Sequence, residues 1–342
     1  MTFRRSSHLR WRQLCRDWSL LLAISIVPFL STIVHAQEVP AQSANAQAAK
    51  KTARKPIKKV SESVVMYAAG DIADCNKKPA PETVAMKTAE IILQGLNAQA
   101  NAVVLTLGDN TYPIGHPDEY AECYEPTWGK FKARTLPTPG NHDYGVPLAY
   151  GYYEYFDELA GPDQRGYYVK RLGNWHVFSL NSNVYGADMR KQLDWLRQQL
   201  DQLSAANKAS TPKNPQCILA AWHHPVFSSG GHGNIDTMRE AWQLLAKAKA
   251  DLVLSGHDHD YERFAPLNSE GERDDKNGIR SFVVGTGGAR LTPMFFAKAT
   301  TEVRSNKTNG VLKLSLHPTS YDWEFIPIEG DSFTDKGKAT CH

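Results

Sequence analysis

Five short polar motifs, rich in aspartate, asparagine and histidine, are spread along the chain, and each follows a short apolar run. In chain order they are Gly70-Asp71, Gly108-Asp109-Asn110-Thr111-Tyr112, Gly140-Asn141-His142-Asp143, His223-His224-Pro225 and Gly256-His257-Asp258-His259. Carboxylate and amide oxygens mixed with imidazole nitrogens suit Fe, Mn or Zn. One such motif alone is typical of a turn, but five in succession predict a metal site.

The apolar runs before the motifs have the pattern of buried β-strands. They cover 64–69, 103–107, 134–139, 218–222 and 252–255. They lack alternation of apolar and polar residues, which is typical of strands buried on both faces. Helical periodicity lies between them at 82–96, 189–203 and 237–249, with Asp188 and Asp236 or Thr237 as expected N-caps. Because ligand sites of open α/β sheets lie at the carboxyl ends of the strands, all five motifs fall at the expected edge.

The later part of the chain predicts further strands. Residues 167–172 and 175–180 flank Gly173-Asn174, which indicates a hairpin, and strands are expected at 281–284, 311–316 and 321–328. We therefore expect an α/β fold, a four-layer α/β/β/α sandwich of two mixed sheets flanked by helices. The sequence shows no internal repeat and no second domain boundary after residue 61.

The order of these motifs resembles that of the calcineurin-like metallophosphoesterases. The tyrosine of Gly-Asp-x-x-Tyr is similar to that of the purple acid phosphatase branch, as are the segments 257–263 and 321–325. The resemblance extends over nearly all of 61–342. The first motif departs from the family, because it reads Asp71-Ile72-Ala73 where Asp-x-Gly is usual. Ala73 could shift this loop but leaves the aspartate in place.

The resemblance implies two metal ions that share Asp109. The first ion, ferric in that branch, would be bound by Asp71, Asp109, Tyr112 and His259. The second, a divalent Fe, Zn or Mn ion, would be bound by Asp109, Asn141, His223 and His257. A phenolate with carboxylates suits a trivalent ion, whereas an amide with imidazoles suits a divalent one. His223 rather than His224 matches the ligand position.

Two metal ions about 4 Å apart can clamp an in-line displacement at phosphorus and activate a bound hydroxide as the nucleophile. We therefore expect a phosphatase for small phosphomonoesters, with His142 and His232 near the leaving group as proton donors. A phosphodiesterase or nucleotide hydrolase with the same site is the enzymatic alternative. A non-catalytic protein that binds metal or phosphate is the other. Arg263 could contact phosphate or pair with a local carboxylate.

The N-terminus has the pattern of a secretory signal peptide. Basic residues up to Arg16 precede an apolar run at 18–34, and Val34-His35-Ala36 is a small-x-small cleavage site. An uncleaved anchor is the alternative, although the run is short for a membrane span. We expect a signal peptide at 1–36, a disordered Ala/Gln/Lys-rich linker at 37–60 and the catalytic domain at 61–342. The protein would then be periplasmic or secreted.

The charge distribution argues against nucleic acid as a partner, and export would permit the cysteines to form disulfides. Residues 1–60 have a net charge of +9 and the whole chain +3, so residues 61–342 have a net charge of −6. This acidic part is unlike a nucleic-acid-coating surface. Outside the leader lie four cysteines, which allow three pairings. We favour Cys75 with Cys123, since each follows a site motif, and this choice pairs Cys217 with Cys341.

Overall fold

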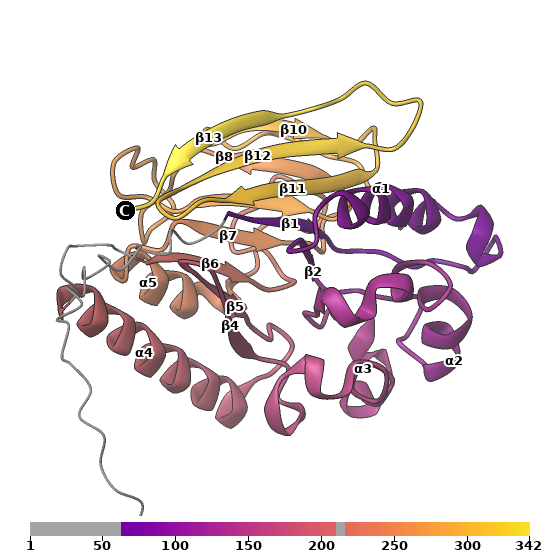
Figure 1. Cartoon of the computed structure of the whole chain (residues 1–342), viewed down its shortest axis with the longest axis horizontal. Coiled ribbons are helices and arrows are strands. Elements are labelled where there is room, and N and C mark those ends of the chain that lie inside the picture. The colour runs from indigo at the N-terminus through magenta and orange to yellow at the C-terminus, as the bar shows by residue number, and fades with distance from the viewer. Residues whose placement is uncertain (1–62, 210–215) are drawn as a thin grey trace, which may run out of the picture. The chain divides into compact units, whose positions relative to one another are not determined.

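The computed structural model describes residues 63–209 and 216–342, so the predicted leader and the whole of the predicted linker lie outside it (Figure 1). Within the described residues, thirteen strands form two mixed sheets. The six-stranded sheet has the order β13-β12-β11-β1-β2-β3. Its strands are β1 (Val64–Ala69), β2 (Val103–Thr106), β3 (Thr135–Leu136), β11 (Gly310–Leu316), β12 (Ser320–Pro327) and β13 (Lys336–Thr340).

The seven-stranded sheet has the order β10-β8-β9-β7-β6-β5-β4. Its strands are β4 (Tyr168–Leu172), β5 (Trp175–Ser179), β6 (Cys217–Ala221), β7 (Leu252–Ser255), β8 (Tyr261–Phe264), β9 (Arg280–Val284) and β10 (Thr301–Ser305). Strands β5, β6, β7 and β9 are parallel, as are β1, β2 and β3 of the other sheet. Each sheet therefore has a parallel part, whose carboxyl ends can present side chains at one edge.

Aromatic pairs join the inner faces of the two sheets. The ring centroids of Trp175 and Tyr321 lie 5.7 Å apart, and those of Tyr261 and Phe325 lie 4.6 Å apart. Each pair takes one ring from each sheet. Such tilted or edge-to-face contacts stabilise a core beyond the area they bury.

Helices cover the outer faces of the sheets. Helix α1 (Val84–Ala98) packs on β1, where Gly95 leaves room for the Tyr67 ring. Helices α4 (Gly186–Ala209) and α5 (Arg239–Lys247) cover the seven-stranded sheet and share a core with Phe178 and Trp222. Short helices α2 (Pro117–Glu119) and α3 (Tyr150–Phe156) follow the second and third motifs. This arrangement confirms the predicted four-layer fold (Figure 1).

Several local predictions were wrong. Asp188 lies inside the first turn of α4, and Met238 rather than Asp236 or Thr237 precedes α5, because a 3-10 turn at Asp236–Met238 displaces its start. The run at 134–139 forms only the two-residue strand β3. Strands β8, β10 and β13 were not predicted. Strand β13 alternates exposed lysines with small residues, so it carries no apolar signal.

Both expected disulfides are present. Cys75 pairs with Cys123 and Cys217 with Cys341, with Cα–Cα distances of 5.9 and 5.6 Å. The first joins the segment after Asp71 to the segment after Tyr112, and the second joins the start of β6 to the C-terminal residues. Among the described residues, no helix combines the length and apolar character needed to cross a bilayer.

Candidate metal centre

The site residues follow the carboxyl ends of parallel strands from both sheets. Asp71 follows β1, Asp109 follows β2, His223 follows β6 and His257 follows β7. The two edges meet directly, because the backbone N–H of Gly70 donates to the Val284 carbonyl at 2.9 Å. The five motifs, which lie up to 189 residues apart in the chain, therefore converge on one region.

Three of these residues have unusual backbone conformations. Asp71, Asp109 and His257 have φ values of 59°, 49° and 72°, in the left-handed region that non-glycine residues rarely adopt. Such conformations persist where the surrounding structure holds them, and they cluster at functional sites. The turn after each strand thus points the side chain of Asp71, Asp109 or His257 towards the same region.

The four side chains of the first predicted metal position bring their donor atoms together. Tyr112 Oη lies 3.0 Å from Asp71 Oδ1, 3.2 Å from Asp109 Oδ2 and 3.1 Å from His259 Nε2. His259 Nε2 lies 3.2 Å from Asp71 Oδ1.

The second predicted position has the same character. Asn141 Oδ1 lies 3.0 Å from both His223 Nε2 and His257 Nδ1, and those two nitrogens lie 3.2 Å apart. His223 Nε2 is also 3.3 Å from Asp109 Oδ2. Because Asp109 Oδ2 contacts donor atoms of both groups, Asp109 occupies the place of a shared ligand.

The donor set fits metal ions. Ligand bonds of about 2.0–2.2 Å place neighbouring donor atoms roughly 3 Å apart around one ion. The observed separations of 3.0–3.3 Å have this size. Asp71 and Asp109 are buried, and their ion-pair partners among the described residues are histidines alone. Two buried carboxylates of this kind favour a bound cation.

Backbone groups orient the imidazoles. His223 Nδ1 lies 2.8 Å from the Leu107 carbonyl, and His259 Nδ1 lies 2.8 Å from the Arg290 carbonyl. These contacts leave Nε2 of both rings facing the donor groups, as outer hydrogen bonds do for metal-binding histidines. Gly140 packs directly against the backbone of Asp109. A side chain at position 140 would not fit there, because its Cβ would lie 2.1 Å from the Asp109 amide nitrogen.

Electrostatics differ between the residues. Burial together with the neighbouring His223 lowers the pKa of His257 to about 2, so His257 keeps the neutral form that binds metal. Burial would lower the pKa of His223, but the Asp109 carboxylate outweighs it and raises that pKa to about 9. Burial and the carboxylates of Asp109 and Asp71 raise the pKa of Tyr112 well above 10. A highly charged cation is what would stabilise its phenolate.

His142 lies beside the donor groups without joining them. Its Nδ1 is 2.6 Å from the Pro113 carbonyl, and its Nε2 is 3.9 Å from Asp109 Oδ2. The ring packs on Tyr112 with centroids 4.4 Å apart and is partly exposed. His142 can therefore meet a substrate from the open side.

His232 is held beside His257 by an aspartate for which the sequence motifs predicted no role. Asp258 Oδ1 lies 3.0 Å from His232 Nδ1 and accepts the His232 backbone N–H at 2.8 Å. Asp258 is fully buried, and its other oxygen accepts the Ser228 hydroxyl. The His232 ring lies 4.4 Å from the His257 ring and is half exposed. The only sequence signal for Asp258 is its place inside Gly256-His257-Asp258-His259.

The contacts of His224 and Arg263 distinguish between the roles that the sequence left open for them. His224 Nδ1 lies 2.8 Å from Ser182 Oγ, and its ring packs on His223 and His257, which agrees with a supporting rather than a ligand position. Arg263 pairs with Asp335 at 2.6 Å and with Glu302. Of the two options for Arg263, the carboxylate pairing is therefore the one observed.

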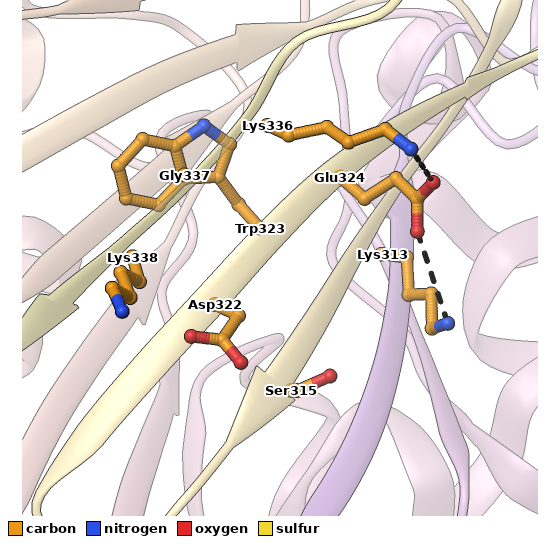
Figure 2. Close-up of a pocket in the computed structure, with 8 residues that line it drawn as sticks. All are labelled: Lys313, Ser315, Asp322, Trp323, Glu324, Lys336, Gly337 and Lys338. Carbon is orange, nitrogen blue, oxygen red and sulfur yellow. Dashed lines mark ion pairs between the residues drawn. The ribbon is translucent and has the colours of Figure 1, made fainter.

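A large surface hollow lies elsewhere and contains none of the predicted site residues. Figure 2 shows the residues that line this pocket, which has a volume of about 510 Å³ and lies on strands β11, β12 and β13 of the six-stranded sheet. Its lining residues are Lys313, Ser315, Asp322, Trp323, Glu324, Lys336, Gly337 and Lys338. Glu324 lies 2.7 Å from Lys336 and 3.9 Å from Lys313, so its charge is already matched.

The fold and the convergent donor groups define a metallophosphoesterase class, and comparison with known proteins agrees. The model of the calcineurin-like phosphoesterase family matches residues 85–261, so the chain belongs to this family. Among curated proteins, it is 28% identical over 189 residues to probable purple acid phosphatase 20 of Arabidopsis thaliana, covering 49% of this chain and 43% of that protein. It is 27% identical over 188 residues to Fe(3+)-Zn(2+) purple acid phosphatase 12 of the same plant, covering 49% and 38%.

The solved structure of purple acid phosphatase PPD1 from yellow lupin has the same fold. It superposes with a TM-score of 0.65 at 18% identity, covering 82% of this chain and 54% of that one. The chain therefore spans less than half the length of these two curated relatives and about half of this solved one.

Proposed function

We propose that this chain is a dinuclear-metal phosphatase that hydrolyses phosphomonoesters. The observation that carries the proposal is the pair of donor groups that share Asp109 Oδ2, with two further histidines beside them. Ions bound there would supply positive charge for the phosphate oxygens and would acidify bound water. The names of the relatives, purple acid phosphatases, support the same activity.

The donor chemistry supports two unlike ions. Asp71, Asp109, Tyr112 and His259 would hold Fe(III), because carboxylates and a phenolate offset a triple charge. Asp109, Asn141, His223 and His257 would hold a divalent Fe, Zn or Mn ion. The relative named for Fe(3+) and Zn(2+) supports this division.

The chain's own histidines supply the proton chemistry. The Pro113 carbonyl holds His142 Nδ1, and the ring is partly exposed beside Asp109. His232 presents its free ring edge while Nδ1 is held by Asp258. In this proposal one of them donates a proton to the leaving alkoxide and the other contacts a phosphate oxygen. Asp258 keeps the His232 ring fixed, which makes Asp258 a positioning residue.

A phosphodiesterase with the same site is the second candidate, because the half-exposed positions of His142 and His232 leave the site open to a second ester group. A non-catalytic binding protein is disfavoured by these two histidines, which a binding site for ions alone does not need. The two disulfides support export, in agreement with the predicted signal peptide. The proposed domain division stays as the sequence predicts it: 1–36, 37–60 and 61–342.

Turnover of p-nitrophenyl phosphate and of bis(p-nitrophenyl) phosphate by the iron- and zinc-loaded protein tests the proposal. We expect faster hydrolysis of the monoester and loss of both activities after chelation. Preferential cleavage of the diester would indicate the second candidate. A protein that holds both metals but cleaves neither ester would be a binding protein.

A further inference from the structure

Six large apolar side chains among the described residues are exposed. They are Ile114, Leu148, Tyr150, Tyr185, Phe295 and Phe296, and we call them the apolar rim. Single exposed apolar residues are normal on any protein surface, whereas a gathering of them marks a binding surface. Each rim residue lies close in the chain to a residue of the candidate metal centre or to a residue that contacts one.

The segment after β9 provides two rim residues. Residues 291–297 read Leu-Thr-Pro-Met-Phe-Phe-Ala and carry no charge. At one end Thr292 N–H donates to the His259 carbonyl at 3.1 Å, and at the other Lys298 N–H donates to Ser229 Oγ at 3.0 Å. The segment thus runs from His259 to the loop that carries His232. Between these anchors, Phe295 is 66% and Phe296 is 93% exposed.

Rim residues also lie on the His142 side. Ile114 follows Pro113, whose carbonyl holds the His142 ring, and Ile114 packs at Gly145. Leu148 follows in the 3-10 turn at Pro147–Ala149 and is 85% exposed, and Tyr150 begins helix α3.

The remaining rim residue, Tyr185, lies in the segment that contacts His224. Ser182 contacts the His224 ring, and Asn183 donates to the Pro139 carbonyl at 3.1 Å. Tyr185 follows two residues later and is 70% exposed. Three separate segments, each linked to residues at or beside the donor atoms, thus carry exposed apolar side chains.

We propose that the apolar rim binds the organic group of the substrate, so that the site selects soluble phosphomonoesters of large apolar alcohols over small polar ones. This inference rests on the proposed function, because the phosphate must bind at the metal centre for the organic group to reach the rim. Full burial of one methylene group corresponds to about a fourfold preference. If the apolar rim covers only one side of the substrate's alkyl group, each methylene gains about half of that free energy. The preference is then about twofold per methylene.

Normal-chain alkyl monophosphates test this preference, since ethyl, butyl and hexyl phosphate share one leaving-group chemistry and differ only in apolar length. With the metal-loaded protein we expect kcat/KM to rise about 16-fold from ethyl to hexyl phosphate, or about twofold for each of four methylenes. The Phe295→Ser/Phe296→Ser double variant should reduce that ratio to about fourfold or less. The Phe295→Leu/Phe296→Leu variant keeps apolar area and should retain most of the ratio. Ala297→Ser is the matched control in the same segment.

Two results would overturn the inference while leaving the phosphatase function in place. One is an equal kcat/KM for all three alkyl phosphates, and the other is an unchanged ratio in the double serine variant. Co-sedimentation with phosphatidylglycerol vesicles that depends on Phe295 and Phe296, together with equal kcat/KM values, would make the segment a membrane contact. Absence of hydrolysis of every ester, with both metals bound, would remove the proposed function itself.

Discussion

Removal of the Cys75–Cys123 disulfide is expected to weaken the metal centre, whereas removal of Cys217–Cys341 is expected to destabilise the fold and spare the centre. Cys75 follows the Asp71 loop, which pairs with the Tyr112 loop because Tyr112 N–H donates to the Ala73 carbonyl at 3.0 Å. Cys123 lies in the next segment, where the Tyr120 hydroxyl donates to Asp143. This disulfide therefore ties together the loops that carry the first group of donor atoms.

The second disulfide lies at the other end of its strand. Cys217 begins β6, whereas His223 follows the end of β6. Cys341 is anchored by its backbone N–H, which donates to the Thr319 carbonyl at 2.9 Å. Its loss should leave the His223 end of the strand in place, so the Cys217→Ser/Cys341→Ser variant is a matched control.

Chain entropy gives the expected stability changes. Sequence separations of 48 and 124 residues correspond to about 4 and about 5 kcal/mol of unfolding free energy at 25 °C. The control variant should thus lose more stability than the Cys75→Ser/Cys123→Ser variant. Loss of groups that orient metal ligands lowers metal affinity by about 10–100-fold, and we expect this loss only in the Cys75→Ser/Cys123→Ser variant.

Urea unfolding of the metal-free proteins measures the free energy of unfolding. Metal-free protein is used because bound metal would add its own stabilisation. The metal affinity is measured as the metal retained after dialysis against graded concentrations of chelator. Turnover of p-nitrophenyl phosphate without urea shows whether the site still functions. Equal metal loss in both variants would show that the effect follows global stability. Wild-type metal affinity in the Cys75→Ser/Cys123→Ser variant would show that this disulfide does not hold the site.

Three further predictions concern the roles of individual residues. His142→Ala should lower turnover about 10²–10⁴-fold with both metals retained in elemental analysis; equal loss of metal would place His142 among the ligands. Asp258→Asn should lower turnover as much as His232→Ala does, and steady-state kinetics should show no added loss in the double variant, because the two residues act as a unit. Additive losses would separate their roles. Tyr112→Phe should abolish visible absorption of the iron-loaded protein while iron remains bound, and an unchanged spectrum would remove Tyr112 from the iron site.

The convergence of the five motifs was predictable because four of them follow a buried strand and the third follows the short strand β3. Parallel strands present their carboxyl ends at one edge, so the strand pattern alone brings Asp71 and Asp109 together. The resemblance to a known family then divided the donors into two groups, and the structure places the donor atoms of each group 3.0–3.3 Å apart.

What the sequence could not predict depends on contacts between distant residues. Asp258 holds His232 across 26 residues, and Ser182 reaches His224 across 42. Neither pair has a local pattern, because a buried hydrogen bond leaves no periodicity in the chain. The apolar rim was also missed, since Phe295 and Phe296 look like core residues until their exposure is known. Arg263 could be assigned only once Asp335, 72 residues later, was seen beside it.

The central claim is that two metal ions share Asp109 and that phosphate ester hydrolysis depends on both. Elemental analysis of the wild type and of Asp109→Asn, with p-nitrophenyl phosphate turnover on the same samples, tests it most directly. We expect two metal ions per wild-type chain, and in Asp109→Asn a reduced occupancy of both positions and no measurable turnover. An Asp109→Asn protein that keeps two metal ions and a near-normal rate would contradict it.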